Sequence, residues 1–166
     1  MSYTYKSPSP IGAIVASSDG TNITGLWFKG QKYFASTLTS NAQKCDLPIF
    51  QKLQKWLNLY FTGIEPNFAL PLKPFGSEFR QLIWKELCKI PYGQVVTYGN
   101  IAKKLSTSAR AIGGAVGHNP ISIIIPCHRV IGTNGNLTGY AGGIDKKIQL
   151  LKLEGAGLII NDKLET

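Results

Sequence analysis

A proline-rich stretch near the middle of the chain, "EPNFALPLKPFG" at residues 65–76, most constrains how this chain can fold. Each of its prolines fixes one backbone dihedral angle and disfavours a helical conformation in the residue before it. Such a stretch cannot continue a helix or a central strand. We predict that it is a linker, so that one domain covers residues 1–76, linker included, and a second covers residues 77–166.

The first domain has the pattern of short strands joined by turns. Short apolar runs such as "AIVASS" and "ITGLWF" alternate with turn-forming residues, namely Pro8, Pro10, Gly12, Gly20, Gly25 and Gly30. This punctuation is typical of antiparallel strands and hairpins. Pro48 then suits the first turn of an amphipathic helix that ends near Gly63. The apolar positions of this helix are Ile49, Leu53, Leu57 and Phe61.

The second domain is predicted to be mainly helical. Ser77 and Thr97 each suit the cap of a helix, and one of Ser106, Thr107 and Ser108 can start another that ends before Pro120. The two short helices after Thr97 lie in a basic segment, which is typical of a helix-turn-helix. The apolar face of the helix after Ser77 is Phe79, Ile83 and Leu87.

A last helix is predicted to follow Asp145, which can cap it, and to end at Glu154 and Gly155. Its expected apolar face is Ile144, Ile148 and Leu151. Lys146 and Lys147 are expected on a different, polar face of the same helix.

The charge balance is strongly basic. The net charge is +9, and residues 79–147 alone carry nine basic and two acidic residues. Such an excess favours solubility first and a nucleic acid or an anionic surface second. No charged-then-apolar leader is present, and no apolar run approaches the ~20 residues of a membrane span. We therefore expect a cytoplasmic protein with no membrane partner, and a monomer by default.

Three cysteines, Cys45, Cys88 and Cys127, are widely spaced and form no C-x-x-C pair. This pattern favours neither a disulfide framework nor a four-ligand zinc site. We expect no bound metal and no cofactor. Because neither a disulfide nor a zinc site is indicated, we expect at least one free thiol that is available for chemistry.

The helix expected after Ser108 consists mainly of small residues: Ala109, Ala111, Gly113, Gly114, Ala115 and Gly117. Each interior glycine costs a helix roughly 0.5–1 kcal/mol relative to alanine, so a close approach of some kind must compensate. Two explanations are open. The helix packs closely against a neighbour, or a nucleic-acid backbone or groove approaches it, with Arg110 as its single long side chain.

The stretch "ISIIIPCHRV" at residues 121–130 places a thiol, an imidazole and a guanidinium side by side after an apolar run. We predict a buried strand over residues 121–125 that Pro126 ends, which would hold Cys127 rigidly in a pocket. A lone cysteine is more often a small core residue. A nucleophilic thiol needs a base or a cation nearby, and His128 is the available base.

A catalytic imidazole also needs a carboxylate on its other ring nitrogen. The second half offers Glu78, Glu86, Asp145, Glu154, Asp162 and Glu165. We favour Glu154, at the end of the last helix. Neighbouring residues of an extended chain point to opposite faces, so a turn or a bridging water must join Cys127 to His128. The pattern indicates an activated cysteine and leaves open a hydrolase, a redox sensor or an alkyl acceptor.

Four ordered motifs carry a resemblance that separates these alternatives: "RAIGGAVGHNPI", "PCHRV", "GYAGG" and "KLEG". Over about residues 77–155 the chain resembles the O6-alkylguanine-DNA alkyltransferases, the methylated-DNA–protein-cysteine methyltransferases. Residues 1–76 resemble the family in layout only. The resemblance implies an α+β fold, with an N-terminal antiparallel-sheet domain of the ribonuclease H-like type. It also implies a C-terminal helical domain with a winged helix-turn-helix DNA-binding motif.

The resemblance implies direct-reversal repair by a suicide enzyme without a cofactor. Cys127 would take the alkyl group from O6-alkylguanine in double-stranded DNA irreversibly, and whether O4-alkylthymine is also accepted stays open. Cys127, a water, His128 and Glu154 would form a proton relay. Asn119 would brace the turn beneath the site. Tyr98 would help to rotate and protonate the departing guanine.

The resemblance also implies how the protein holds DNA. The small-residue helix becomes the recognition helix, which enters the minor groove, and Arg110 fills the stack where the base was. The implied DNA-binding residues are Tyr98, Ala109, Arg110, Gly113 and Thr133. The implied walls of the base pocket are Val130, Tyr140 and Ala141. A base inside a paired duplex cannot reach a buried thiol, so it must be extruded.

Some positions depart from the family pattern. The segment between Tyr98 and Arg110 is a residue or two shorter than in many relatives, and Ala141 stands where some relatives have a serine that donates to O6. The zinc ligands found in the first domain of some relatives have no match. Arg129 is expected to brace the structure rather than to contact phosphate.

Two other functions remain as alternatives at this point. A non-catalytic binder of alkylated DNA would lack the acceptor cysteine, which this chain has. A thiol hydrolase would need an oxyanion donor, and none is evident in the sequence.

Overall fold

The computed structural model describes residues 2–137 and 139–156, which divide into two compact units. The first comprises the chain up to Phe75 together with Pro120–Ser122, and the second comprises Gly76–Asn119 and the chain from Ile123 onward. The end of the predicted second domain, with the candidate carboxylates of Asp162 and Glu165, lies outside the described residues.

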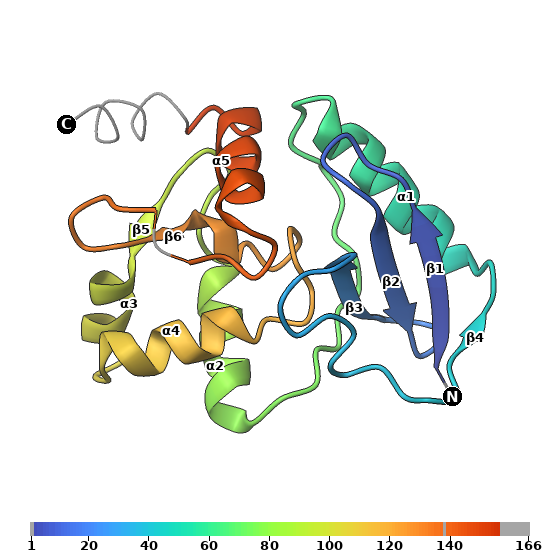
Figure 1. Ribbon diagram of the computed structural model, residues 1–166, viewed down its shortest axis with the longest axis horizontal. Coiled ribbons are helices and arrows are strands. Elements are labelled where there is room, and N and C mark those ends of the chain that lie inside the picture. The colour runs from blue at the N-terminus through green and yellow to red at the C-terminus, as the bar shows by residue number, and fades with distance from the viewer. Residues whose placement is uncertain (1, 138, 157–166) are drawn as a thin grey trace. The chain divides into compact units, whose positions relative to one another are not determined.

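The first unit is built on a four-stranded sheet with the strand order β3-β2-β1-β4 (Figure 1). The strands are β1 (Tyr3–Ser7), β2 (Ile14–Ser18), β3 (Ile23–Phe28) and β4 (Gln43–Lys44). The first three are antiparallel, as predicted, whereas the short β4 pairs parallel to β1. The β2–β3 turn is closed by Asp19, whose Oδ1 accepts hydrogen bonds from the backbone N–H groups of Thr21 and Asn22 at 3.0 and 2.8 Å. The β3 edge is covered by bridges to Leu72 and Ile121.

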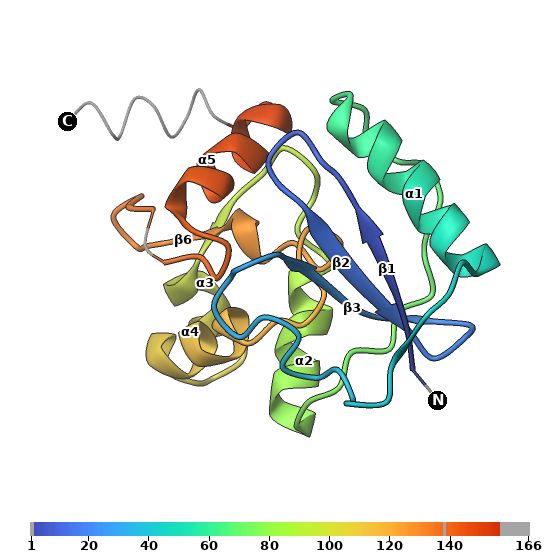
Figure 2. The same ribbon diagram turned by 45° about the vertical axis from the view of Figure 1, so that its right-hand side comes forward.

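Helix α1 (Pro48–Phe61) lies along one face of this sheet (Figures 1 and 2). Its first residue is a proline, as predicted, because the first turn of a helix has no partner for a backbone N–H. Its buried residues are Ile49, Phe50, Leu53, Leu57 and Tyr60. Phe50 stacks on Tyr5 with ring centroids 5.3 Å apart. Phe61, predicted on the buried face, is only half-buried, and Tyr60 takes its place.

The second unit contains the helices α2 (Glu78–Leu87), α3 (Tyr98–Lys104), α4 (Ala109–Gly117) and α5 (Ile144–Leu153). The caps predicted from the sequence are present. Ser77, Thr97 and Ser108 accept hydrogen bonds from the third backbone N–H of α2, α3 and α4, respectively. A two-stranded parallel sheet of β5 (Val96–Thr97) and β6 (Val130–Ile131) accompanies them.

Helices α3 and α4 are joined by a short turn and pack against each other. In that turn Ser106 adopts a left-handed conformation with φ 53°, and the N–H of Thr107 donates to the carbonyl of Ala102 at 2.9 Å. The indole N–H of Trp84 on α2 donates to the carbonyl oxygen of Ala115 on α4 at 2.8 Å. These contacts form the predicted helix-turn-helix, and the predicted α+β fold is confirmed.

Three local predictions are wrong. Residues 121–125 do not form a strand: Ile121 makes a single bridge and turns follow, with φ 70° at Ile123. Helix α5 is capped by Gly143, with φ 100°, and Asp145 lies in its first turn. Phe79 is 42% exposed, while Trp84 is buried in its place. The course of residues 121–125 and the exposure of Phe79 depend on contacts distant in sequence, which local periodicity does not contain.

Lys147 is the fourth correction. It was predicted on the polar face of α5, but its side chain is fully buried. The buried face of α5 continues from Lys147 through Leu150 and Leu151 to Glu154. Of the helices that the structure describes, none is long and apolar enough to span a membrane.

Candidate active site

Cys127 begins a single turn of 3-10 helix, Cys127–Arg129, directly after Pro126. Its side chain is buried, with 4% of the residue exposed. The Cys127 N–H donates to the carbonyl of Ile125 at 2.8 Å, and that of Arg129 donates to the carbonyl of Pro126 at 3.0 Å. These two bonds fix the backbone that carries the thiol, directly after Pro126 and without a preceding strand.

The 3-10 turn removes the obstacle raised by an extended chain. Three residues per turn separate neighbouring side chains by roughly 120° rather than placing them on opposite faces. Cys127 and His128 therefore face adjoining parts of the interior. The structure brings the thiol and the imidazole into one buried region without a strand.

His128 is fully buried and pairs with Glu154, as predicted. Its Nε2 lies 2.6 Å from Oε2 of Glu154. Its other ring nitrogen, Nδ1, is buried and makes no hydrogen bond with the described residues. Burial lowers the pKa of His128 against the hydrogen bond and charge of Glu154, which raise it. The imidazole is therefore neutral at rest and has one nitrogen available to accept a proton.

Glu154 follows the last residue of α5 and is held by several donors. Nε of Arg129 donates to its Oε1 at 2.7 Å, and Nη2 of Arg129 donates to its Oε2 at 3.1 Å. Burial alone would raise the pKa of this carboxyl, but the hydrogen bonds and charges of His128 and Arg129 lower it to about 2. The predicted bracing role of Arg129 is thus a specific one, because it holds the carboxylate that pairs with His128.

The thiol itself is neutral at rest. Burial raises the pKa of Cys127, while the side chain of Asn119 and the charge of Lys147 lower it. Asn119 is buried directly after α4, and its Nδ2 donates to the carbonyl oxygen of Ile125 at 2.8 Å. Asn119 therefore closes the turn beneath Cys127. Ionisation of the thiol requires that its proton be removed during the reaction.

Lys147 is the residue of this site that the sequence analysis missed. Its ammonium group donates to the carbonyl oxygens of Val130 and Gly139 at 2.6 and 3.3 Å, and it lies 6.0 Å from the ring centroid of Tyr98. Burial lowers its pKa to about 8, whereas ionisation of Cys127 would act to raise that pKa. The spacing Lys147, Leu150/Leu151, Glu154 is a helical stripe and could have identified this lysine.

The remaining predicted pocket and DNA residues fall into two groups. Val130 is fully buried in β6, and Tyr140 and Ala141 are half-buried in the loop before α5. Thr133 is exposed, and its hydroxyl lies beside Gly99 in the first turn of α3. Ala109 and Arg110, in the first turn of α4, are exposed.

The glycines of α4 do not serve packing within the described protein. A Cβ added at Gly113, Gly114 or Gly117 would meet no heavy atom within 4 Å beyond the helix's own backbone. The explanation by close packing against a neighbouring helix is therefore wrong for these three residues. The small-residue surface of α4 is open to a partner.

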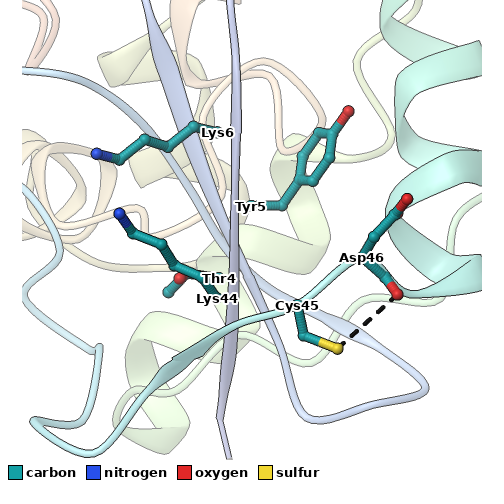
Figure 3. A pocket seen from close by; sticks show the side chains of 6 residues that line it. All are labelled: Thr4, Tyr5, Lys6, Lys44, Cys45 and Asp46. Atoms are coloured by element: carbon teal, nitrogen blue, oxygen red, sulfur yellow. Dashed lines mark hydrogen bonds between the residues drawn. The ribbon is translucent and has the colours of Figure 1, made fainter.

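A separate cavity of about 340 Å³ lies in the first unit (Figure 3). It is lined by Thr4, Tyr5, Lys6, Lys44, Cys45 and Asp46. Figure 3 shows the ammonium groups of Lys6 and Lys44 on one side and the Cys45 thiol, which lies 3.8 Å from the carbonyl of Asp46, on the other. None of the site residues described above lines this cavity. Within the described ranges, no group of three metal-ligating side chains occurs.

The fold and the site define a class: a helix-turn-helix protein with a buried cysteine beside a histidine–glutamate pair. Residues 78–156 match the model of the 6-O-methylguanine DNA methyltransferase DNA-binding domain, and residues 1–74 match that of the ribonuclease-like domain of the same proteins. The chain belongs to the 6-O-methylguanine DNA methyltransferase family, which confirms the assignment made from the motifs.

Individual relatives are similar over most of their length. A methylated-DNA–protein-cysteine methyltransferase of Haemophilus influenzae is 44% identical over 92% of this chain and 85% of its own. One of Methanosarcina acetivorans is 43% identical over 89% and 95%. The crystal structure of Mycobacterium tuberculosis OGT in complex with DNA matches with a TM-score of 0.81 and 41% identity, over 97% of this chain and 99% of that one.

Proposed function

We propose that this protein repairs alkylated DNA by direct reversal, as a methylated-DNA–protein-cysteine methyltransferase with Cys127 as the acceptor. The single observation that supports it best is the buried pair of His128 and Glu154 beside the thiol, with Nδ1 of His128 available. The family assignment supports double-stranded DNA that contains O6-alkylguanine as the substrate.

The proton relay removes the proton of the buried Cys127 thiol during the reaction. Nδ1 of His128 accepts the Sγ proton of Cys127 through a bridging water, and Glu154 stabilises the imidazolium that forms. The thiolate attacks the alkyl carbon, a carbon–sulfur bond forms and the bond from that carbon to O6 breaks. The electron pair returns to the guanine, which gains a proton from Tyr98. Tyr98 regains a proton from solvent, and the imidazolium of His128 releases the former thiol proton to solvent, so that both side chains return to their starting forms. Overall, the thiol hydrogen is exchanged for the alkyl group.

The product explains why the protein acts once. An alkyl thioether is unreactive, because its release would require a nucleophile to displace the Cys127 thiolate from an alkyl carbon that carries no activating group. We therefore propose that Cys127 remains alkylated after one transfer. A thiol hydrolase would regenerate the cysteine, and a non-catalytic binder would never modify it.

The open surface of α4 is the proposed DNA-binding face. The absence of side chains at Gly113 and its neighbours permits close approach to the minor groove, and Ala109 continues that surface. Arg110 enters the stack as the guanine is extruded. Tyr98 and Thr133, which flank Gly99, complete the contacts to DNA, and Val130, Tyr140 and Ala141 form the base pocket.

A single measurement separates these functions. The intact mass of the protein is determined after incubation with duplex DNA that contains O6-methylguanine. Direct reversal predicts a permanent gain of one methyl group in place of one hydrogen, located at Cys127 by peptide mapping. Demethylated guanine without a mass gain would indicate a hydrolase, and unaltered DNA with retained binding would indicate a non-catalytic binder.

This activity requires access to DNA, and we place the protein in the cytoplasm as a monomer. The division into domains near residue 76 remains part of the same proposal. A variant that lacks residues 1–76 would test this division, because residues 77–166 should then still fold cooperatively.

A further inference from the structure

We propose that Arg129 is a positioning residue of the proton relay, which fixes Glu154 against Nε2 of His128 and keeps the imidazole in its neutral, proton-accepting form. This inference rests on the proposed function, because it concerns the same relay. Arg129 is placed neither at the DNA nor at the alkyl group.

The geometry of Arg129 uses three of its nitrogens. Nε and Nη2 donate to the two oxygens of Glu154, and Nη1 donates to the carbonyl oxygen of Ile90 at 2.8 Å. The guanidinium also lies 5.7 Å from the ring centroid of Tyr92. A two-pronged contact of this kind fixes the plane of a carboxylate, which a single hydrogen bond does not.

The carboxylate has little freedom left. Oε2 is shared by His128 and Arg129, while Oε1 accepts from Nε of Arg129 and lies 3.5 Å from the N–H of Gly93. Tyr92 also contacts α5, with its hydroxyl 3.5 Å from the carbonyl of Leu153. The distance of 2.6 Å between His128 and Glu154 therefore depends on the groups that hold the carboxylate, and Arg129 supplies two of those hydrogen bonds.

The charges around His128 give this arrangement a second effect. The groups that act on the imidazole are Glu154 and Lys147 from α5 and Arg129 from its own turn, beside the neutral thiol of Cys127. Glu154 raises the pKa of His128, and the charges of Arg129 and Lys147 lower it. A buried carboxylate requires a compensating cation. If Arg129 did not supply this cation, His128 would supply it by taking up a proton.

The consequence concerns the reaction directly. An imidazolium cannot accept the proton of Cys127, so a protonated His128 would stop the relay before it starts. Arg129 neutralises Glu154 and leaves His128 uncharged. Glu154 can then stabilise the imidazolium once the proton has moved.

The test is the pH dependence of single-turnover methyl transfer, measured below neutral pH under saturating DNA. In Arg129→Met, His128 takes a proton more readily. The acid limb, which is the fall in transfer rate on acidification, should therefore shift to higher pH by about one unit or more. The double variant R129M/E154Q removes the unpaired carboxylate together with the cation. Its acid limb should return toward that of the unsubstituted protein, although its maximal rate stays low.

Arg129→Lys tests the geometric part. Lysine keeps the charge but cannot grip both oxygens, so the limb should shift less than in Arg129→Met while the maximal rate falls. Lys55→Met on α1 removes an exposed positive charge outside the basic segment of residues 79–147 and should leave the limb unmoved. If Arg129→Met does not fold, the double variant and Arg129→Lys carry the comparison.

Two results would overturn the inference. The first is an unshifted acid limb in Arg129→Met and Arg129→Lys despite lowered stability in urea, which would make Arg129 a structural brace only. The second is a double variant whose limb is displaced as far as that of the single variant. Failure of the proposed function looks different, because the unsubstituted protein itself would then transfer no methyl group.

Discussion

The ammonium nitrogen of Lys147 donates a 2.6 Å hydrogen bond to the carbonyl oxygen of Val130, from a side chain that is fully buried. This bond ties helix α5 to strand β6, and a second bond at 3.3 Å reaches Gly139, next to Tyr140. A lysine in this position orders the proposed base pocket and places a cation near Cys127.

Burial of Lys147 predicts a specific dependence of stability on pH. Its pKa is about 8 in the folded protein and near 10.5 in the unfolded chain, so the unfolded chain binds more protons between these values. The free energy of unfolding therefore gains up to roughly 3 kcal/mol from this group as the pH rises through that window. We expect the stability difference between the unsubstituted protein and Lys147→Met to grow with pH in urea titrations from pH 7.5 to 9.5.

The neighbouring Lys146 is a matched control, because it is only half-buried. For Lys146→Met, the plot of the free energy of unfolding against pH should run parallel to that of the unsubstituted protein. Parallel curves for Lys147→Met as well would mean that Lys147 is not charged differently in the two states.

Cys127→Ser should abolish methyl transfer and retain binding to alkylated duplex DNA. A hydroxyl proton is far harder to remove than a thiol proton, and the exposed surface of α4 is untouched by the change. Intact mass and gel-shift measurements check the two parts. Loss of DNA binding along with activity would indicate that Cys127 serves the structure instead.

Arg110→Ala should slow repair strongly in duplex DNA and only mildly on free O6-benzylguanine. Extruding a base costs a few kcal/mol in a duplex, and a side chain that fills the gap offsets part of this cost. Single-stranded substrate should give an intermediate loss. Transfer rates on the three substrates check the prediction. Equal losses on both DNA forms would exclude the extrusion role, and a similar loss on the free base would indicate damage to the pocket.

Gly113→Ala should raise stability while it weakens DNA binding. The added methyl group meets no heavy atom within 4 Å beyond the helix's own backbone, and alanine favours a helix over glycine by roughly 0.5–1 kcal/mol. The same methyl group would obstruct close approach of the minor groove. Urea unfolding and DNA titration should therefore change in opposite senses, with the reaction on free O6-benzylguanine as the unaffected control. Unchanged DNA affinity would remove Gly113 from the interface.

DNA affinity should fall steeply with salt. Lysine and arginine side chains displace condensed counterions, with a slope in the double-logarithmic plot of about −0.9 for each neutralised phosphate. Binding titrations between low and moderate salt measure this slope. A flat dependence would contradict the expectation that the basic segment of residues 79–147 faces DNA.

Much of the site could be predicted where neighbouring residues carry the signal. Ser77 and Thr97 are predicted as caps, and Ser108 is one of three candidates for a third, because a short polar side chain satisfies N–H groups a few residues away. The choice of Glu154 as the partner of His128 followed from the scarcity of acidic residues and the end of a helix.

Other features could not be predicted because distant contacts decide them. Residues 121–125 are as apolar as a buried strand, yet they turn, since Ile121 is fixed by Leu26 in the first unit and Ile125 by the side chain of Asn119 in the second. The purpose of the glycines in α4 stayed open until their surroundings were known.

The sequence by itself determined the helices of the second domain, the caps at Ser77 and Thr97, the reactive trio of Cys127, His128 and Arg129, and the family, because these depend on residues near one another in the chain. The tertiary structure alone decided the 3-10 turn that orients the thiol, the grip of Arg129 on Glu154 and the burial of Lys147. The physical reason is that desolvation, charge pairing and carbonyl partners for a buried ammonium come from segments distant in sequence. Whether a charged side chain faces water or the interior is set by those segments.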